Sequence, residues 1–243
     1  MISPSALQAT SRLQAVKPTV YRQYEVAALR ADGSRWIWQK QAAATPLLDS
    51  AFAAFGRGIL LSGVDGPIAV EDLQPGDMLK TVSGEPAPVV WIGSTTFVPA
   101  NSGVRTPLIR VMADSFGISR PTSFLTLGPA ARILQTLPHI RAANGGLETL
   151  TPAGAFVDNV NVIRIHPPTP VRLFHFCLSR HAAVDVGGVA VETFHPGMRA
   201  LRAMSHHERE DFLDLFPHIH HSSDFGPLAN PRALERDHTT HAA

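Results

Sequence analysis

Residues 54–77 read AFGRGILLSGVDGPIAVEDLQPGD, and this stretch decides the fold. Its short apolar runs alternate with turns that are rich in glycine and proline. Pro75 and Gly76 fit the two central positions of a type II turn, where glycine supplies a positive φ. The same punctuation continues to residue 197, and it predicts an all-β fold built from short strands.

Further turns divide the chain beyond this stretch. Residues 83–85 are a predicted turn, and Gly187 and Gly188 are predicted to close the last hairpin. The remaining candidate strands cover residues 78–82, 87–92, 108–112, 125–127, 133–135, 160–165 and 171–178.

The N-terminal part is predicted to contain a hairpin within residues 21–53. Residues 24–30 and 35–40 flank Asp32-Gly33, which is a favourable hairpin turn. Trp36 and Trp38 are spaced to lie on one face of the second strand, where packing is favoured over a ligand platform. Residues 1–20 are polar and unpatterned, so we expect them to be disordered.

The C-terminal part has a different sequence pattern, which is helical rather than strand-like, from residue 201 onward. Ser205 and Glu208 form a capping-box pattern, and Phe212, Leu215 and Phe216 follow on one helical face. This predicts a short docked helix within a helical extension over 201–221. Residues 222–243 are polar and are predicted to form a flexible tail.

The opening stretch resembles that of a Hint domain, the self-processing module of inteins and hedgehog C-terminal regions. The family run begins Cys-Phe-x-x-Gly and passes through Asp-Gly to Val-Glu-Asp-Leu-x-x-Gly-Asp. The chain keeps that spacing at Phe55, Gly58, Asp65, Gly66, Val70, Glu71, Asp72, Leu73, Gly76 and Asp77. The resemblance implies a Hint-like β-fold over 54–200, with the N-terminal hairpin and the short C-terminal helix added to it.

Two later stretches extend the resemblance. Residues 87–93 (APVVWIG) are similar to a strand of bacterial Hint proteins, and residues 174–197 are similar to the closing hairpin of that branch. The kept residues there are Arg180, His181, Gly188, Glu192, Phe194, His195, Pro196 and Gly197. This motif resembles the type found in alphaproteobacteria. No asparagine ends the hairpin, so the resemblance does not imply splicing.

The resemblance also shows which chemical groups are replaced. Ala54 stands where the family has its cysteine nucleophile. Residues 125–134 (LTLGPAARIL) are similar to the Thr-x-x-His block, with Gly128 and Ala131 in place of its threonine and histidine. In the family, the thiol attacks the preceding carbonyl while threonine and histidine assist, and a methyl group can do neither.

These replacements predict a catalytically degenerate Hint domain. Its expected role is that of a non-catalytic binding or scaffolding module for an unidentified protein partner. If only these three positions are at fault, the combined substitutions Ala54→Cys, Gly128→Thr and Ala131→His should restore thiol-dependent cleavage after Ala53.

The alternative is residual self-processing with an unrecognised nucleophile. Enzymatic activity is therefore not settled by the sequence, although the replaced residues argue against it. The candidate nucleophiles are Ser50, which is out of register, and Cys177, the single thiol. Cys177 lies in an apolar run, where a packing role is favoured over reactivity. His181 and His195 are residual candidates as well, although without partners at 54 and 131 we expect them to hydrogen-bond turns.

His218, His220 and His221 are weak candidates for metal ligands. Zinc sites need three or four converging ligands, which this tail supplies only weakly, and a solvated surface cluster is favoured. We expect no metal and no cofactor.

Composition narrows the function classes further. The chain has 243 residues with 21 basic and 20 acidic side chains and no basic run, so we expect no nucleic-acid partner. No stretch reaches the roughly 20 apolar residues of a membrane span. The N-terminus lacks the apolar core of a secretion signal, and the one cysteine suits a reducing compartment, which predicts a cytoplasmic protein. Export without a signal stays open.

Overall fold

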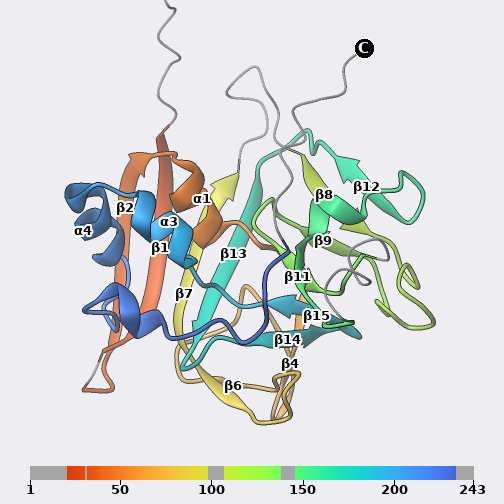
Figure 1. Cartoon of the computed structure of the whole chain (residues 1–243), viewed down its shortest axis with the longest axis horizontal. Coiled ribbons are helices and arrows are strands. Elements are labelled where there is room, and N and C mark those ends of the chain that lie inside the picture. Colours follow the sequence, from red (N-terminus) through yellow and green to blue (C-terminus); the bar gives the residue numbers. More distant parts are fainter. Residues whose placement is uncertain (1–20, 31, 98–106, 138–145, 234–243) are drawn as a thin grey trace, which may run out of the picture.

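The computed structural model describes residues 21–30, 32–97, 107–137 and 146–233, and it is built mainly from short strands in two sheets (Figure 1). In the first half of the chain the strands are β1 (Tyr21–Leu29), β2 (Arg35–Ala43), β3 (Phe55–Gly56), β4 (Leu60–Gly63), β5 (Gly66–Ala69), β6 (Met78–Leu79), β7 (Ala87–Phe97) and β8 (Leu108–Val111). Then come β9 (Leu125–Leu127), β10 (Arg132–Leu134), β11 (Leu150–Pro152), β12 (Val162–Ile165), β13 (Val171–Leu178), β14 (Ala183–Val186) and β15 (Val189–Glu192).

The larger sheet is organised around two long neighbours, β7 and β13. Its strand order is β12-β8-β9-β3-β13-β7-β6-β4-β5, and the smaller sheet has the order β11-β10-β15-β14. β13 runs antiparallel to β7 from the pair Val171 and Phe97 to the pair Leu178 and Val89. Gly187 and Gly188 both have positive φ and turn β14 into β15. The predicted all-β class is confirmed.

The predicted N-terminal hairpin is present, and it belongs to the larger sheet. β1 and β2 pair antiparallel from Tyr21 opposite Ala43 to Leu29 opposite Arg35. β1 also pairs with β7, an arrangement that the sequence did not reveal. The rings of Trp36 and Trp38 stack with centroids 5.9 Å apart, as their spacing predicted.

A short helix that we did not predict, α1 (Pro46–Phe52), joins the hairpin to β3. Thr45 is its N-cap, since the Thr45 hydroxyl accepts from the N–H of Leu48 at 3.2 Å, and Pro46 occupies the first turn. Both are ordinary helix-start signals. The helix ends at Phe52, immediately before the segment that resembles the Hint opening.

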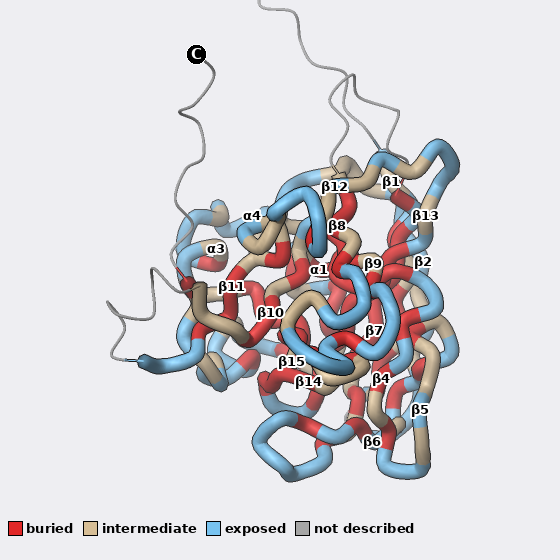
Figure 2. Tube along the Cα trace, turned by 90° about the vertical axis from the view of Figure 1, so that its right-hand side faces the viewer, coloured by how far each residue is buried: buried red, intermediate tan, exposed pale blue. Residues whose placement is uncertain are grey.

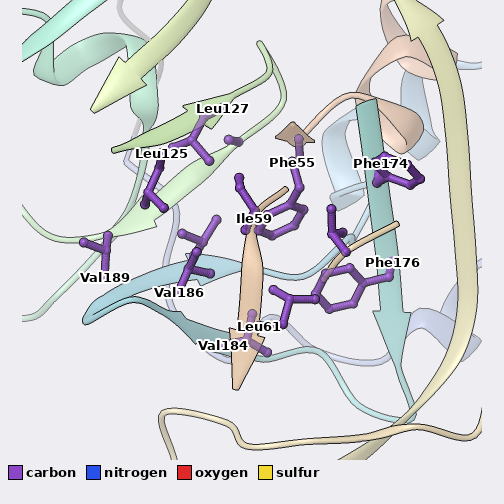
Figure 3. Close-up of a cluster of buried hydrophobic side chains, with 14 of the residues drawn as sticks. Phe55, Ile59, Leu61, Leu125, Leu127, Phe174, Phe176, Val184, Val186 and Val189 are labelled. Atoms are coloured by element: carbon purple, nitrogen blue, oxygen red, sulfur yellow. The ribbon is translucent and has the colours of Figure 1, made fainter. Parts of the chain in front are cut away.

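The main hydrophobic core lies between the two sheets (Figure 3). Phe55 of β3 packs against Phe176 of β13 with ring centroids 5.1 Å apart. The burial pattern shows buried residues running along the strands and exposed ones gathering at the turns (Figure 2). Other members of this core are Ala54, Ile59, Leu61, Leu127, Ala131, Phe174, Val184, Val186 and Val191.

A second, aromatic core joins the hairpin, α1 and the C-terminal part. Trp91 of β7 stacks on Phe216 with centroids 4.6 Å apart, and its indole N–H donates to the carbonyl of Leu215 at 2.7 Å. Other buried members are Tyr24, Val26, Phe52, Cys177, Phe194, Phe212 and Phe225. This cluster explains why short helices dock here rather than fray.

The C-terminal part contains two short helices rather than the single one predicted, α3 (Met198–Ala203) and α4 (His206–Leu213). The capping box of Ser205 and Glu208 at the start of α4 is confirmed. Leu215 and Phe216 lie beyond the helix end, yet both are buried in the aromatic core.

The prediction of a flexible tail over 222–243 is wrong for residues 222–233. They include the 3-10 helix η2 (Ser222–Phe225) and pack on the smaller sheet, because Arg232 reaches the buried carboxylate of Glu192. The rest of that tail, and the predicted disorder of residues 1–20, lie outside the described residues. No described helix combines the length and the apolar character needed to cross a membrane.

Candidate functional site

The three positions Ala54, Gly128 and Ala131 meet around one peptide bond. Ala54 immediately precedes β3, and Gly128 and Ala131 follow β9, which pairs with β3 through Phe55 and Leu127. The N–H of Gly128 donates to the carbonyl of Ala54 at 2.7 Å. Ala54 and Ala131 are both fully or almost fully buried. The strand pairing therefore brings together the positions that the sequence singled out.

Both polar groups of the Ala53–Ala54 peptide bond are hydrogen-bonded to the backbone. The carbonyl of Ala53 accepts from the N–H of Ala130 at 3.0 Å, and the N–H of Ala54 donates to the carbonyl of Phe174 at 3.0 Å. A Cβ atom built on Gly128 would overlap both the carbonyl carbon and the carbonyl oxygen of Ala53. Glycine at 128 thus allows two backbone segments to approach closely.

This arrangement holds a carbonyl without offering chemistry at it. The N–H of Ala130 is placed like a single backbone donor of an oxyanion hole, since it contacts the carbonyl oxygen of Ala53. The side chains at 54, 128 and 131 are a methyl group, a hydrogen atom and a methyl group. None of them can attack the carbonyl or carry a proton to the leaving nitrogen.

His175 is a buried histidine next to this site that our sequence reasoning missed. It follows Phe174 on β13, and its Nδ1–H donates to the carbonyl of Ser50 at 3.0 Å. Among the described residues nothing hydrogen-bonds to its Nε2 atom. Burial lowers the pKa of His175 to about 4, although the carbonyl of Ser50 acts in the opposite direction. The only sequence signal was a histidine between two phenylalanines in a strand.

Among the described residues, no base is hydrogen-bonded to the side chain of either proposed substitute nucleophile. The hydroxyl of Ser50 donates to the carbonyl of Leu47 at 2.6 Å, and His175 faces the carbonyl of Ser50 rather than its hydroxyl. The thiol of Cys177 is buried in the aromatic core and lies 3.8 Å from the carbonyl of Phe194. Burial raises the pKa of Cys177 well above its usual value, so the thiolate is disfavoured.

His181 and His195 belong to a buried polar network around Glu192. His181 donates from Nε2 to Glu192 at 3.0 Å and accepts at Nδ1 from the N–H of Ala229 at 2.9 Å. His195 donates from Nε2 to the carbonyl of Gly226 at 3.1 Å. Both residues bind the C-terminal segment, so neither is directed at Ala54.

The three weak metal candidates do not converge. His218 is partly buried with its ring centroid 6.2 Å from that of Phe216, whereas His220 and His221 are exposed and their backbone N–H groups bind Asp224. Within residues 21–30, 32–97, 107–137 and 146–233, no group of three or more His, Cys, Asp or Glu side chains is placed to hold a metal ion.

A largely apolar cavity of about 660 Å³ lies between the β1–β2 hairpin, α1 and the C-terminal helices. Tyr24, Trp38, Leu48, Met204 and Phe212 contribute to its lining. Its volume is within the range of small-molecule sites. Residues 54, 128 and 131 do not line it, whereas Ser50 and Arg132, which are close to them in the sequence, do.

Acid is expected to destabilise the protein below about pH 6.5, because His175 and His195 stay neutral in the folded chain. Burial lowers the pKa of each from 6.5 to about 4. Between these values the unfolded chain binds protons that the folded chain does not, so the free energy of unfolding falls as the pH falls. The slope is about 1.4 kcal/mol per pH unit for each histidine. Urea unfolding at neutral pH and at about pH 5 measures it.

The matched control for this prediction is the double variant His206→Gln/His207→Gln, which alters two exposed histidines of α4. It should keep the wild-type slope. A free energy of unfolding that stays level across this pH range would contradict the buried, neutral state of His175 and His195.

Comparison with known proteins points to one family. The model of the family described as "Hint domain" matches residues 53–198. The solution structure of a bacterial intein-like domain from Clostridium thermocellum is similar with a TM-score of 0.41 and 11% identity, covering 59% of this chain and 99% of that one. The crystal structure of the MchDnaB-1 intein has a TM-score of 0.33 and 14% identity, covering 58% and 100%. No match is found among curated proteins.

Proposed function

We propose that this chain, which belongs to the Hint domain family, is a non-catalytic member that binds a protein partner in place of processing itself. The observation that carries the proposal is the Ala53–Ala54 peptide bond. The Hint fold holds this bond between β13 and the segment after β9, yet no side chain at 54, 128 or 131 can react with it.

The immediate surroundings of that bond support the same conclusion. The close approach of Gly128 to the carbonyl of Ala53 leaves no space for a threonine side chain between them. His175 follows Phe174, which accepts from the N–H of Ala54, and its Nδ1 atom is occupied by the carbonyl of Ser50. A catalytic role for the bond would need both a nucleophile and a proton donor, and the side chains at 54, 128 and 131 supply neither.

The bacterial, alphaproteobacterial type and a cytoplasmic location are parts of this proposal. The first rests on the closing motif with Glu192, His195 and Gly197, and the second on the single cysteine, which suits a reducing compartment. The alternative, residual self-processing through Ser50 or Cys177, has no supporting contact, because the hydroxyl and the thiol both contact backbone carbonyl groups rather than a base.

Intact mass spectrometry tests the proposal. Protein with a tag at each end is incubated with an excess of thiol and with hydroxylamine, which together release thioesters and esters. We expect the full-length mass alone, because the attack on the Ala53 carbonyl has no nucleophile.

Fragments that meet between Ala53 and Ala54 would refute the non-catalytic proposal. In that case Ser50→Ala and Cys177→Ala identify the nucleophile, since only one of these substitutions should abolish cleavage. The same incubation of Ser222→Ala, which alters an unrelated hydroxyl, controls for breakdown that does not depend on the site.

A further inference from the structure

Residues 226–233 form a segment, here called the strap, that lies along the edge of β11 in the smaller sheet (Figure 1). The N–H of Leu150 donates to the carbonyl of Pro231 at 2.8 Å, and the N–H of Ala233 donates to the carbonyl of Leu150 at 3.0 Å. Leu150 and Arg232 form a parallel bridge between these bonds. The strap is therefore bound as an added strand, through its backbone.

The side chain of Arg232 enters a buried slot beneath this edge. Its Nε and Nη2 atoms donate to one carboxylate oxygen of Glu192 at 2.9 and 2.8 Å, and Nη2 also donates to the carbonyl of His195 at 2.6 Å. Only 3% of the Glu192 side chain is exposed. A Cβ atom at Gly197 would lie 2.6 Å from Nη1 of Arg232, so glycine leaves the space that the guanidinium fills.

Two histidines bind the strap backbone beside this slot. Nδ1 of His181 accepts from the N–H of Ala229 at 2.9 Å, and Nε2 of His195 donates to the carbonyl of Gly226 at 3.1 Å. The site thus binds backbone groups along the segment and one side chain in a pocket. Strand-addition sites for extended peptides share this division, in which the backbone gives affinity and the pocket gives specificity.

The slot favours arginine over lysine. Two nitrogen atoms of one guanidinium reach Glu192, and one of them also reaches the carbonyl of His195. A lysine ammonium is a single point charge on a flexible stem and cannot place two nitrogen atoms there. Arg132 lies 3.4 Å from the other oxygen of Glu192, so the carboxylate already has one permanent cationic neighbour.

We infer that the edge of β11, with Glu192 beneath it, is a strand-addition site for an extended segment that carries an arginine, and that the strap fills this site within the chain. The partner is then a protein that presents such a segment and displaces the strap. The biological role of this site rests on the proposed binding function, whereas its occupation by arginine does not depend on whether the chain cleaves itself.

The strap hides the site from weak competitors, because a tethered segment acts at an effective concentration on the order of millimolar. The test therefore weakens the strap in the full-length protein with Arg232→Glu, which places like charges together. The probe is a fluorescein-labelled peptide of residues 226–233 (GPLANPRA), followed by fluorescence anisotropy. Arg232→Ala is the second variant, in which Arg132 and His181 still face Glu192.

We expect the peptide to bind both variants at least tenfold more tightly than the wild-type protein. A peptide with lysine in place of arginine should bind the variants at least tenfold more weakly, and one with uncharged citrulline more weakly still. The matched control is Arg202→Glu, an exposed arginine on α3, which should behave like the wild type.

Two results would overturn the inference: a folded Arg232 variant that binds no peptide, and equal binding of the arginine and citrulline peptides. A second copy of this chain is the other candidate occupant, and wild-type protein added in place of the peptide tests it. If the Arg232→Glu variant captures the wild-type protein, the site belongs to a second copy of this chain rather than to a different protein. Since none of these readouts involves cleavage, failure here leaves the mass-spectrometry result on the non-catalytic proposal unaffected.

Discussion

Replacing Glu192 by glutamine is expected to lower the free energy of unfolding by about 3–5 kcal/mol, the range for removing one partner of a buried ion pair. Glutamine keeps the shape of the side chain and can still accept the hydrogen bond from His181. It removes the charge that faces Arg232 and Arg132, both of which contact the Glu192 carboxylate. Urea unfolding at neutral pH, followed by circular dichroism, measures the loss.

The control is Glu85→Gln, because Glu85 also forms an ion pair with an arginine, Arg180, but its side chain is 82% exposed. An exposed pair of this kind contributes about 1 kcal/mol or less. If both substitutions lower the free energy of unfolding by the same amount, the buried network around Glu192 stabilises the fold no more than an exposed ion pair does.

The pKa of Glu192 is lowered by its partners, whereas the pKa values of His175 and His195 are lowered by burial. Burial alone would raise the pKa of Glu192, but the hydrogen bond from His181 and the charge of Arg232 outweigh it and hold the pKa below the usual 4.5. The folded chain therefore favours the ionised form. This stabilisation is present above pH 4.5 and is lost as the pH falls through the lower, folded-state pKa. The Glu192→Gln variant should lose less stability than the wild type in that acid range.

Local signals predicted most of the fold. The turn at Gly187 and Gly188, the capping box at Ser205 and the hairpin around Asp32-Gly33 each depend on residues within one turn of the chain. Such features are set by backbone conformations that few residue types adopt, so they can be recognised in one sequence. The Hint resemblance implied the overall β-fold, which these local signals cannot supply.

Pairings between distant segments were not predictable in the same way. β1 pairs with β7 across more than sixty intervening positions in the chain, and no sequence pattern in either strand indicates that the other is its partner. α1 was missed although Thr45 and Pro46 form a typical helix start, because only seven residues follow before Ala53. A helix this short depends on tertiary packing, here through Phe52 against Tyr24 and Trp91.

The residues of the candidate site also differ in whether local sequence signals could locate them. Ala54, Gly128 and Ala131 could be placed from the sequence because motif spacing located them, whereas His175 could not, since its role comes from a contact with Ser50 on a separate element. Arg232 was overlooked in a polar tail that was predicted to be flexible. Its contact with Glu192 spans forty positions, and a polar segment becomes ordered when one charged side chain has a buried partner.

The closing motif acquires a physical meaning from this network. His181, Glu192, His195 and Gly197 all contact or make space for the strap, and none of them is one of the positions 54, 128 and 131. Alanine, glycine and alanine at 54, 128 and 131 are therefore compatible with these contacts. Under the proposed function, self-processing is lost while the surface that binds an extended segment is kept, because the two involve different residues.

The substitution Gly128→Thr is expected to destabilise the fold by about 3 kcal/mol or more, at the upper end of the range for overpacking. The added Cβ atom would overlap the carbonyl group of Ala53, which is backbone and cannot rotate away as a flexible side chain could. The Gly128 N–H bond to Ala54 would be strained by any shift that relieved this contact. Urea unfolding of the single variant gives the magnitude.

This steric limit changes the expected outcome of restoration. The sequence alone suggested that Ala54→Cys, Gly128→Thr and Ala131→His together would restore thiol-dependent cleavage after Ala53, but the backbone around residue 128 leaves no room for the threonine. We now expect the triple variant to be unstable and uncleaved. The control is Gly154→Ala, whose added Cβ would lie 3.9 Å from Ile109, an ordinary contact, so it should change the stability by about 1 kcal/mol at most. If Gly128→Thr proves as stable as Gly154→Ala, the Ala53 carbonyl can move aside, and the triple variant should then release fragments on addition of thiol.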